Sequence, residues 1–259
     1  MAEKQRVSWQ NYNGDDRVVS AHEMTLTLER RKDSVFKVKS LIPSLDQAIE
    51  HFEAGELIVT SGPTKNGKSL FCQSLTANFS RQGCPCLWFS YELTPRGFLG
   101  SFPSLPELYM PMKLRGHDLS WMENRIDESF AKYRTRIVFI DHLHYCLDMA
   151  RTKNPSIEIG QVIRRLKSMA VEKEIVVFLL CHTKMGKHDG TLSYESIRDS
   201  SFVSQESDTV LMIQRKPDLG ENRARLRVEF HRRTGVMEKT VDLIKVDGLL
   251  REVTRWAGP

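Results

Sequence analysis

The sequence predicts an α/β domain, a mostly parallel sheet with helices on both faces and an antiparallel hairpin at its C-terminal end. Short apolar runs rich in β-branched residues recur along the chain, and helical periodicity fills the segments between the first four runs. Two stretches that alternate apolar and polar residues follow near the end. Near-continuous apolar strands are typical of a parallel sheet that is buried on both faces. We expect one main domain over residues 35–259, preceded by a polar arm over residues 1–34.

The elements follow in order along the chain. Ser20 and Glu23 form a capping box that predicts a helix over residues 20–32 of the arm. Ser44 and Gln47 predict a second capping box, for a short helix that ends before Gly55. The predicted strands are residues 57–61, 86–91, 136–141, 175–182 and 210–213; the predicted helices are residues 68–80, 118–133 and 156–173; the hairpin strands are residues 224–231 and 238–246. The polar, aperiodic stretch 183–204 predicts a working loop.

Composition narrows the class of protein. Of 259 residues, 40% are hydrophobic and 27% are charged, which excludes a fibrous or largely disordered chain. The net charge of +5 permits a polyanionic partner without requiring one. The five cysteines contain no CxxC pair and predict buried thiols in a reducing compartment. The longest apolar run is far below the roughly 20 residues that span a bilayer. We therefore expect a cytoplasmic protein without a membrane partner, of cellular, organellar or viral origin.

A phosphate-binding motif stands between the first predicted strand of the sheet and the helix that follows it. Residues 62–69 match the pattern G-x-x-x-x-G-K-[ST]. Its glycines let backbone N–H groups turn toward phosphate oxygens, and the helix N-terminus adds its positive end. Lys68 is expected to reach the β- and γ-phosphates, and the Ser69 hydroxyl to bind Mg²⁺. The predicted cofactors are ATP and Mg²⁺, and the predicted nucleotide-binding residues are Gly62, Pro63, Thr64, Lys65, Asn66, Gly67, Lys68, Ser69 and Leu70.

Three other side chains follow strands at the carboxyl edge, where open α/β sheets build their sites. Asp141 closes one strand and is the candidate acid on the metal side, together with Ser69. Glu92 follows the strand 86–91 and is the candidate group that polarises the attacking water. His182 closes a third strand and is expected beside the γ-phosphate. Structural roles stay open for all three: a capping aspartate, a solvated glutamate and a core histidine.

The ordered set of motifs resembles the hexameric RecA-type ATPase domain of DnaB- and Twinkle-like replicative helicases, members of helicase superfamily 4. The matching stretches lie within residues 35–250 and are 55–59 leading into 62–64, then 88–93, 140–144, 204–208 and 231–235. The resemblance implies a RecA-like P-loop ATPase core. It also implies a 5′–3′ ATP-dependent DNA helicase that forms a hexameric ring on single-stranded DNA, with a primase or other replication proteins as further partners.

The resemblance also implies roles for single residues. Glu92 corresponds to the catalytic glutamate, Asp141 to the acid on the metal side, and His182 to the γ-phosphate sensor, where some relatives have Gln. Arg233 corresponds to an arginine finger that is given to a neighbour's ATP. The implied DNA-binding residues of the central pore are Arg198, Asp199, Ser200 and Ser201. The chain departs from the family pattern at three positions, which are His231 in place of a frequent Lys, His144 in place of Gln, and Ser201 in place of a frequent Gly.

Several alternatives stay open at this point. Relatives usually carry an N-terminal primase, primase-like or collar domain, so the chain is interpreted either as an excised core or as a minimal stand-alone ATPase. The helix 20–32 is expected to dock on an adjacent subunit. The function is alternatively that of a recombinase-like or mediator ATPase forming filaments on DNA, or of an ATP-binding loader or regulatory subunit with little turnover. Basic runs at residues 223–227 and 164–167 are either solvated faces or DNA contacts.

Overall fold

The computed structural model describes residues 9–31, 35–147, 155–182 and 200–253. Contacts divide the chain into two units, Met1–Val35 and Phe36–Pro259. The first unit contains the short helix η1 (Trp9–Asn11) and the helix α1 (Ala21–Arg31). The Glu23 N–H donates to Ser20 Oγ at 3.1 Å, so the predicted helix start at Ser20 is confirmed.

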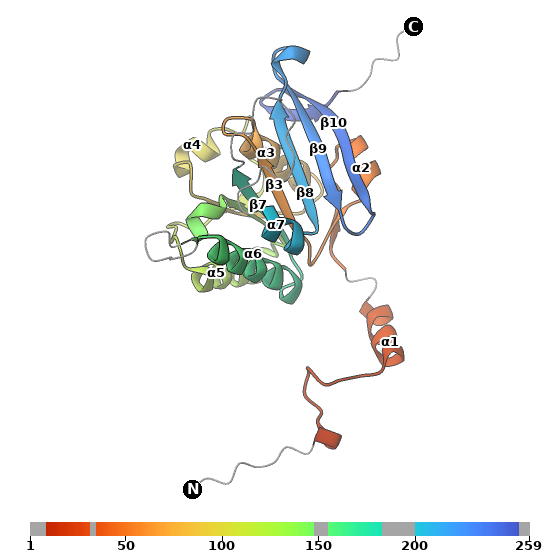
Figure 1. Ribbon diagram of the computed structural model, residues 1–259. Helices are drawn as coiled ribbons and strands as arrows, with labels where there is room; N and C mark the ends of the chain where they lie inside the picture. Colours follow the sequence, from red (N-terminus) through yellow and green to blue (C-terminus); the bar gives the residue numbers. More distant parts are fainter. Residues whose placement is uncertain (1–8, 32–34, 148–154, 183–199, 254–259) are drawn as a thin grey trace. The chain divides into compact units, whose positions relative to one another are not determined.

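A nine-stranded sheet forms the centre of the second unit among the described residues (Figure 1). The strand order is β11-β10-β9-β8-β3-β7-β6-β4-β5. Strands β8, β3, β7, β6, β4 and β5 pair in parallel, and β8, β9, β10 and β11 pair antiparallel. The bounds are β3 (Leu57–Gly62), β4 (Cys86–Ser90), β5 (Leu108–Tyr109), β6 (Ile137–Asp141), β7 (Val176–His182), β8 (Thr209–Arg215), β9 (Arg223–His231), β10 (Val236–Val246) and β11 (Leu249–Glu252). A separate antiparallel pair joins β1 (Lys37–Val38) to β2 (Phe52–Glu53).

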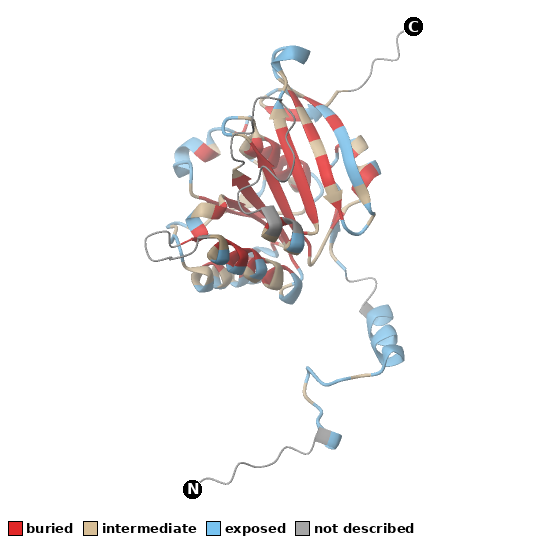
Figure 2. Cartoon of the chain, viewed as in Figure 1, coloured by how far each residue is buried: buried red, intermediate tan, exposed pale blue. Residues whose placement is uncertain are grey.

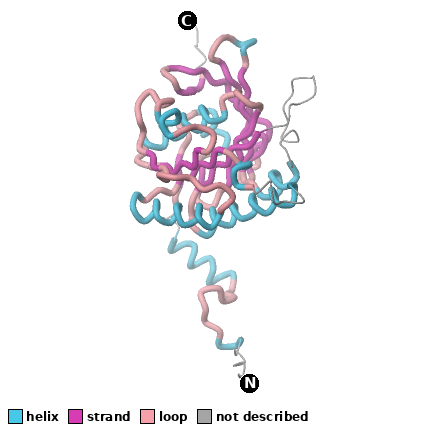
Figure 3. Tube along the Cα trace, turned by 90° about the vertical axis from the view of Figure 1, so that its left-hand side faces the viewer, coloured by secondary structure: helices cyan, strands magenta, loops and turns pink. Residues whose placement is uncertain are grey.

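Helices cover both faces of this sheet because its parallel strands are apolar on both sides. In β6, Ile137 and Phe139 pack in one core cluster with residues of α2 (Pro43–Ile49) and α3 (Lys68–Ser80). Val138 and Ile140 pack in a second cluster with residues of α5 (Leu119–Tyr133) and α6 (Pro155–Glu172). The central strands are buried throughout (Figure 2), and Figure 3 shows the strands as a layer between helices. The helices are α2 (Pro43–Ile49), α3 (Lys68–Ser80), α4 (Pro95–Leu99), α5 (Leu119–Tyr133), η3 (Leu143–Cys146), α6 (Pro155–Glu172), α7 (Ser200–Glu206) and η5 (Pro217–Leu219). The predicted fold class is confirmed.

The second predicted capping box is wrong. The helix α2 begins at Pro43, its N-cap is Ile42, and no side chain caps it. Proline suits the first helical turn because its missing N–H would have no intrahelical partner there. Ser44 instead donates through its N–H, at 2.8 Å, and through its hydroxyl to the carboxylate of Glu252. The Ser44 hydroxyl, which was expected to form a capping box with Gln47, therefore forms a tertiary contact with Glu252 instead.

The C-terminal part is larger than the predicted hairpin. Strand β9 pairs with β10 as expected, but β8 also pairs antiparallel with β9, and β11 pairs with β10. Residues 200–204 of the predicted loop 183–204 belong instead to the helix α7. Sequence reasoning also missed β11, the helix α4 and the strand β5. These elements have two to five residues, too few for hydrophobic periodicity to reveal them.

Gly62, the last residue of β3, occupies a position that requires glycine. Its φ is +150°, and a Cβ atom there would lie 2.2 Å from the carbonyl oxygen of Ile213 in β8. Gly83 has a φ of +70°, and a Cβ atom there would have no heavy atom within 4 Å, so a substitution at Gly83 introduces backbone strain without a clash. We expect Gly83→Ala to lower the free energy of unfolding by about 1–2 kcal/mol, and Gly62→Ala to lower it further. Chemical denaturation of the two variants measures the difference, and equal losses would contradict the steric account.

Candidate functional site

The carboxyl ends of four parallel strands bring the candidate site residues to one edge of the sheet. Gly62 of β3 is the register partner of His182 of β7, and Ser90 of β4 is the partner of Asp141 of β6. Glu92 lies two residues beyond Ser90. The structure therefore groups the phosphate loop with all three side chains that the sequence placed at strand ends, at the edge where open α/β sheets bind their ligands.

The phosphate loop connects β3 to α3, and Lys68 is the first residue of that helix. Gly67 caps the helix in the left-handed conformation, with φ +95°. The N–H groups of the first helical turn have no intrahelical acceptor, so they are available to an anion. Lys68 Nζ donates to the carbonyl oxygens of Gly62 and Pro63, each at 3.0 Å. Burial lowers the pKa of Lys68, and the nearby carboxylates of Glu92 and Asp141 oppose that shift.

Ser69 and Asp141 provide paired oxygen ligands beside this loop. The Ser69 hydroxyl donates to Asp141 Oδ2 at 2.8 Å, and Asp141 is only 2% exposed. Burial raises the pKa of the Asp141 carboxyl, while the hydrogen bond from Ser69 lowers it. Mg²⁺ prefers hard oxygen ligands, and it usually binds through one or two protein groups plus water and phosphate. This pair of oxygens therefore fits Mg²⁺.

Glu92 is held by two histidines. His182 Nε2 lies 3.0 Å and His142 Nε2 lies 3.1 Å from the same oxygen, Glu92 Oε1. The hydrogen bonds from His142 and from His182 hold the pKa of the Glu92 carboxyl well below its usual range. A glutamate with an ordinary pKa is already ionised at neutral pH, and these contacts extend the ionised form of Glu92 to more acidic pH. Sequence reasoning missed His142, although its position directly after Asp141 at a strand end was a usable signal.

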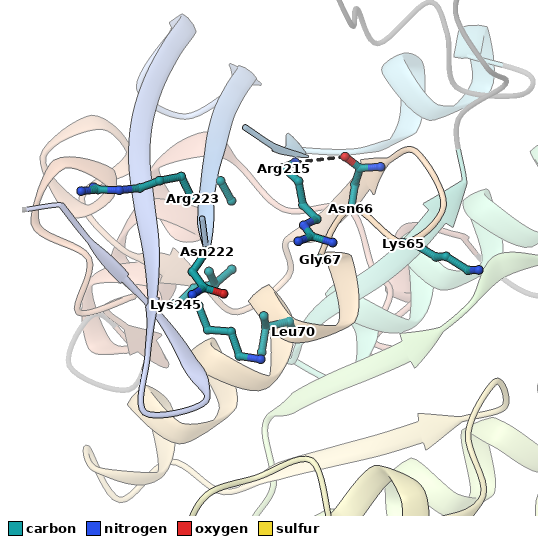
Figure 4. A pocket seen from close by; sticks show the side chains of 10 residues that line it. Lys65, Asn66, Gly67, Leu70, Arg215, Asn222, Arg223 and Lys245 are labelled. Atoms are coloured by element: carbon teal, nitrogen blue, oxygen red, sulfur yellow. Dashed lines mark hydrogen bonds between the residues drawn. The ribbon is translucent and has the colours of Figure 1, made fainter. Parts of the chain in front are cut away.

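A pocket of about 230 Å³ opens beside the phosphate loop (Figure 4). The Arg215 N–H donates to Asn66 Oδ1 at 3.0 Å, which ties the loop to the end of β8. Figure 4 shows the Arg215 side chain beside Gly67, with Asn222, Lys245 and Leu70 gathered below it. The pocket is lined by Lys65, Asn66, Gly67, Leu70, Arg215, Asn222, Arg223, Ala224, Lys245 and Leu250. Its wall of C-terminal strands was not predicted, because it depends on which strands are neighbours in the sheet.

The two basic runs are mostly engaged within the chain. Five of their six cations form ion pairs at 2.6–3.1 Å. The pairs are Arg164 with Glu206, Arg165 with Glu123, Lys167 with Asp208, Arg225 with Asp242, and Arg227 with Glu229 and Glu238. The sixth, Arg223, lines the pocket of Figure 4. This pairing favours the interpretation of both runs as paired surface charges over DNA contacts.

Arg233 lies apart from the other candidate residues. It follows β9, and its guanidinium donates to Glu56 at 3.2 Å, to Glu50 at 2.7 Å, and to the carbonyl oxygens of Ile49 and His51. Glu56 directly precedes β3, whereas the phosphate loop directly follows it. The six residues of β3 span roughly 20 Å. Arg233 is thus at the opposite end of this strand from the phosphate loop of its own chain.

The predicted DNA-binding loop falls largely outside the described residues. Arg198 and Asp199 are not described, and Ser200 and Ser201 are described only as the backbone at the start of α7. The DNA-binding assignment of these four residues stays a prediction.

Comparison with known proteins decides the family. The sequence profile of the DnaB-like helicase C-terminal domain matches residues 111–245, just over half of the chain. The chain belongs to this DnaB-like helicase family. The resemblance inferred from the motifs is therefore confirmed.

Relatives and solved structures agree with this family. The DnaB-like chain is 25% identical over 207 residues to a "Probable replicative DNA helicase" of Trieres chinensis, covering 66% of this chain and 46% of the relative. It is 22% identical over 231 residues to a "Replicative DNA helicase DnaB" of Rickettsia typhi, covering 72% of this chain and 46% of the relative. The chain thus spans about half the length of these relatives.

Two solved structures share the fold of the DnaB-like chain. One, an isolated ATPase domain, superposes with a TM-score of 0.78 at 17% identity, over 92% of this chain and 100% of the other. The other is a DnaB-like replicative helicase, in a structure that also describes its interactions with primase. It superposes with a TM-score of 0.75 at 18% identity, over 93% of this chain and 69% of the other. Among the described residues, none of the helices is both long and apolar enough to cross a membrane.

Proposed function

We propose that this chain is the ATP-hydrolysing core of a ring-forming replicative helicase that moves on single-stranded DNA. The observation that carries the proposal is the convergence of Lys68, the Ser69–Asp141 pair and ionised Glu92 at one sheet edge. The family membership and the replicative helicases among the relatives support it. Domain boundaries at residues 1–34 and 35–259, and a cytoplasmic location, are part of the same proposal.

In this proposal the phosphates of ATP lie against the phosphate loop and the N-terminus of α3. Lys68 Nζ exchanges the carbonyl oxygens of Gly62 and Pro63 for phosphate oxygens, which a cation binds more strongly. The base and ribose enter the adjoining pocket beside Arg215 (Figure 4). Ser69 and Asp141 hold Mg²⁺, which when bound neutralises charge on the phosphate oxygens.

Glu92 acts as the general base that orients the attacking water and accepts its proton. Its carboxylate is ionised at neutral pH, and the hydrogen bonds from His142 and His182 stabilise that form. His182 is the candidate γ-phosphate sensor, and it pairs in register with Gly62 of the phosphate loop. In this proposal the same imidazole exchanges Glu92 for a γ-phosphate oxygen when ATP binds.

In this proposal Arg233 acts on the ATP of a neighbouring subunit. Since this arginine lies at the far end of β3 from its own phosphate loop, it serves ATP only if it belongs to a neighbouring subunit. A hexamer, 5′–3′ movement and contact with a primase are further parts of the proposal, which rest on the family resemblance.

Strand displacement on a forked DNA duplex tests this function against the two alternatives. With ATP and Mg²⁺, the assembled protein is expected to separate the strands, and negative-stain images are expected to show rings. Filaments that hydrolyse ATP without displacing a strand would support a recombinase-like ATPase instead. The absence of ATP turnover with and without DNA would support a loader or regulatory subunit.

Arg198→Ala is expected to weaken single-stranded DNA binding with little dependence on sequence. Loss of one phosphate contact to single-stranded DNA reduces the slope of log K against log salt by about 0.7 per subunit. The matched control is Arg251→Ala, since Arg251 is a half-exposed arginine whose partner is Asp247. Fluorescence anisotropy with a labelled oligonucleotide at several salt concentrations measures both variants. An unchanged slope for Arg198→Ala would remove this residue from the DNA path.

A further inference from the structure

The two histidines that contact Glu92 differ in the hydrogen bonding of their second ring nitrogen. Both place Nε2 within 3.1 Å of Glu92 Oε1, but their second ring nitrogens differ. His142 Nδ1 accepts a hydrogen bond from the backbone N–H of His144 at 3.3 Å. His182 Nδ1 is buried and has no hydrogen-bond partner among the described residues. His142 is therefore fixed at both ends of its ring, and His182 at one end only.

The backbone contact also determines which nitrogen of His142 carries the proton. A neutral imidazole has one donor and one acceptor nitrogen. Because Nδ1 accepts from the His144 N–H, the proton lies on Nε2, which then donates to Glu92 Oε1. His142 is the N-cap of η3, so the turn that follows β6 sets the ring in this orientation. Its side chain is 12% exposed, against 23% for His182.

The same three residues have the composition of a metal site, and the geometry argues against that use. Their ligand atoms lie within 4.8 Å of one another. A metal ion bound at His142 Nε2 would move the ring proton to Nδ1, where it would face the N–H of His144. Ligating histidines instead normally donate their second N–H to an acceptor. The observations favour a hydrogen-bonding role.

We propose that His142 is a positioning residue that keeps Glu92 oriented for hydrolysis after His182 has turned from Glu92 to the γ-phosphate. The proposal rests on the roles that the proposed function gives to Glu92 and His182. Both histidines contact Oε1, and no described residue forms a hydrogen bond with Oε2. In this proposal Oε2 is the oxygen that receives the proton of the attacking water.

Glu92 Oε2 is the proton acceptor of the proposed hydrolytic step. The water oxygen bonds to the γ-phosphorus, the bond from that phosphorus to the bridging oxygen breaks, and ADP leaves. The water proton passes to Glu92 Oε2 and later to solvent. His142 keeps its own proton throughout and maintains its hydrogen bond to Oε1.

Steady-state ATPase kinetics of three variants test this role. We expect His142→Ala to lower kcat by about 10- to 100-fold, the size of one hydrogen bond to a charged group, with KM for ATP little changed. His142→Gln is expected to recover most of kcat, because its amide N–H can replace Nε2–H. The matched control is His144→Gln, which keeps the backbone N–H and is expected to stay within about twofold of wild type. A fall in kcat that glutamine does not rescue would overturn the proposal.

A double-mutant cycle separates positioning from a general structural role. If His142 acts through Glu92, adding His142→Ala to Glu92→Gln should lower kcat no further. A full additional loss of kcat in the double variant would overturn the proposal. A zinc chelator that raised the wild-type ATPase rate in excess Mg²⁺ would also overturn it, because Glu92, His142 and His182 would then be a metal site. If the wild-type protein had no ATPase activity, the proposed function itself would be refuted. If the wild-type protein hydrolysed ATP and His142→Ala left kcat unchanged, only the role of His142 would be refuted.

Discussion

Rings that mix Arg233→Ala chains with Lys68→Ala chains are expected to recover ATPase activity that neither variant has alone. Arg233→Ala alone is expected to lower turnover by about 10³–10⁵-fold, the effect of an arginine finger supplied by a partner. Lys68→Ala alone is expected to lose tight ATP·Mg²⁺ binding. In a mixed ring, some subunit interfaces combine an intact phosphate loop with an intact Arg233. Those interfaces are expected to hydrolyse ATP.

The intrachain contacts of Arg233 make a stability control necessary. Its guanidinium binds Glu50 and Glu56 and two carbonyl oxygens, so its removal also loosens the segment before β3. Thermal unfolding of Arg233→Ala measures that contribution separately. A structural arginine would give a lower Tm without recovery in mixed rings. No recovery in rings proven to be mixed, or a full rate for Arg233→Ala alone, would remove this residue from the mechanism.

Glu92→Gln is expected to keep ATP·Mg²⁺ binding and to lower kcat by about 10²–10⁴-fold, the usual contribution of a positioned acid–base group. Glutamine has the same shape and still offers an oxygen to His142 and His182, but it cannot accept the proton of water. Equilibrium binding of a fluorescent ATP analogue and steady-state turnover separate the two properties.

The control for this substitution is Glu107→Gln, which changes an exposed glutamate beside β5 whose carboxylate accepts from Tyr109. Its turnover is expected to equal that of wild type. Equal losses of binding and turnover in Glu92→Gln would make Glu92 a structural residue.

The parallel core and the main site could be predicted because both depend on local patterns. The apolar strands were long enough to recognise, α3 occupies residues 68–80 as predicted, and parallel strands necessarily bring their carboxyl ends to one edge. Asp141, Glu92 and His182 could therefore be grouped before any geometry was known. Ser69 was paired with Asp141 from the chemistry of Mg²⁺ alone, and the structure places their oxygens 2.8 Å apart.

Other features depend on tertiary contacts that no local pattern contains. The partner of Ser44 is Glu252, which lies 208 residues away in the sequence. A capping box is recognised from residues three positions apart, so this distant contact could not be predicted from it. The wall that Arg215 forms beside the phosphate loop results from β8 lying next to β3. The contact of His142 with Glu92 requires β4 and β6 to be neighbours, which is a property of strand order.

We expect the sheet edge that carries Lys68, Asp141 and Glu92 to hydrolyse ATP in response to single-stranded DNA. The steady-state ATPase rate of the assembled protein, measured with Mg²⁺ in the presence and absence of a single-stranded oligonucleotide, tests it most directly. The rate is expected to rise on addition of the oligonucleotide, and to be nearly abolished in Glu92→Gln under both conditions. A rate that is the same with and without DNA, or that survives in Glu92→Gln, would contradict it.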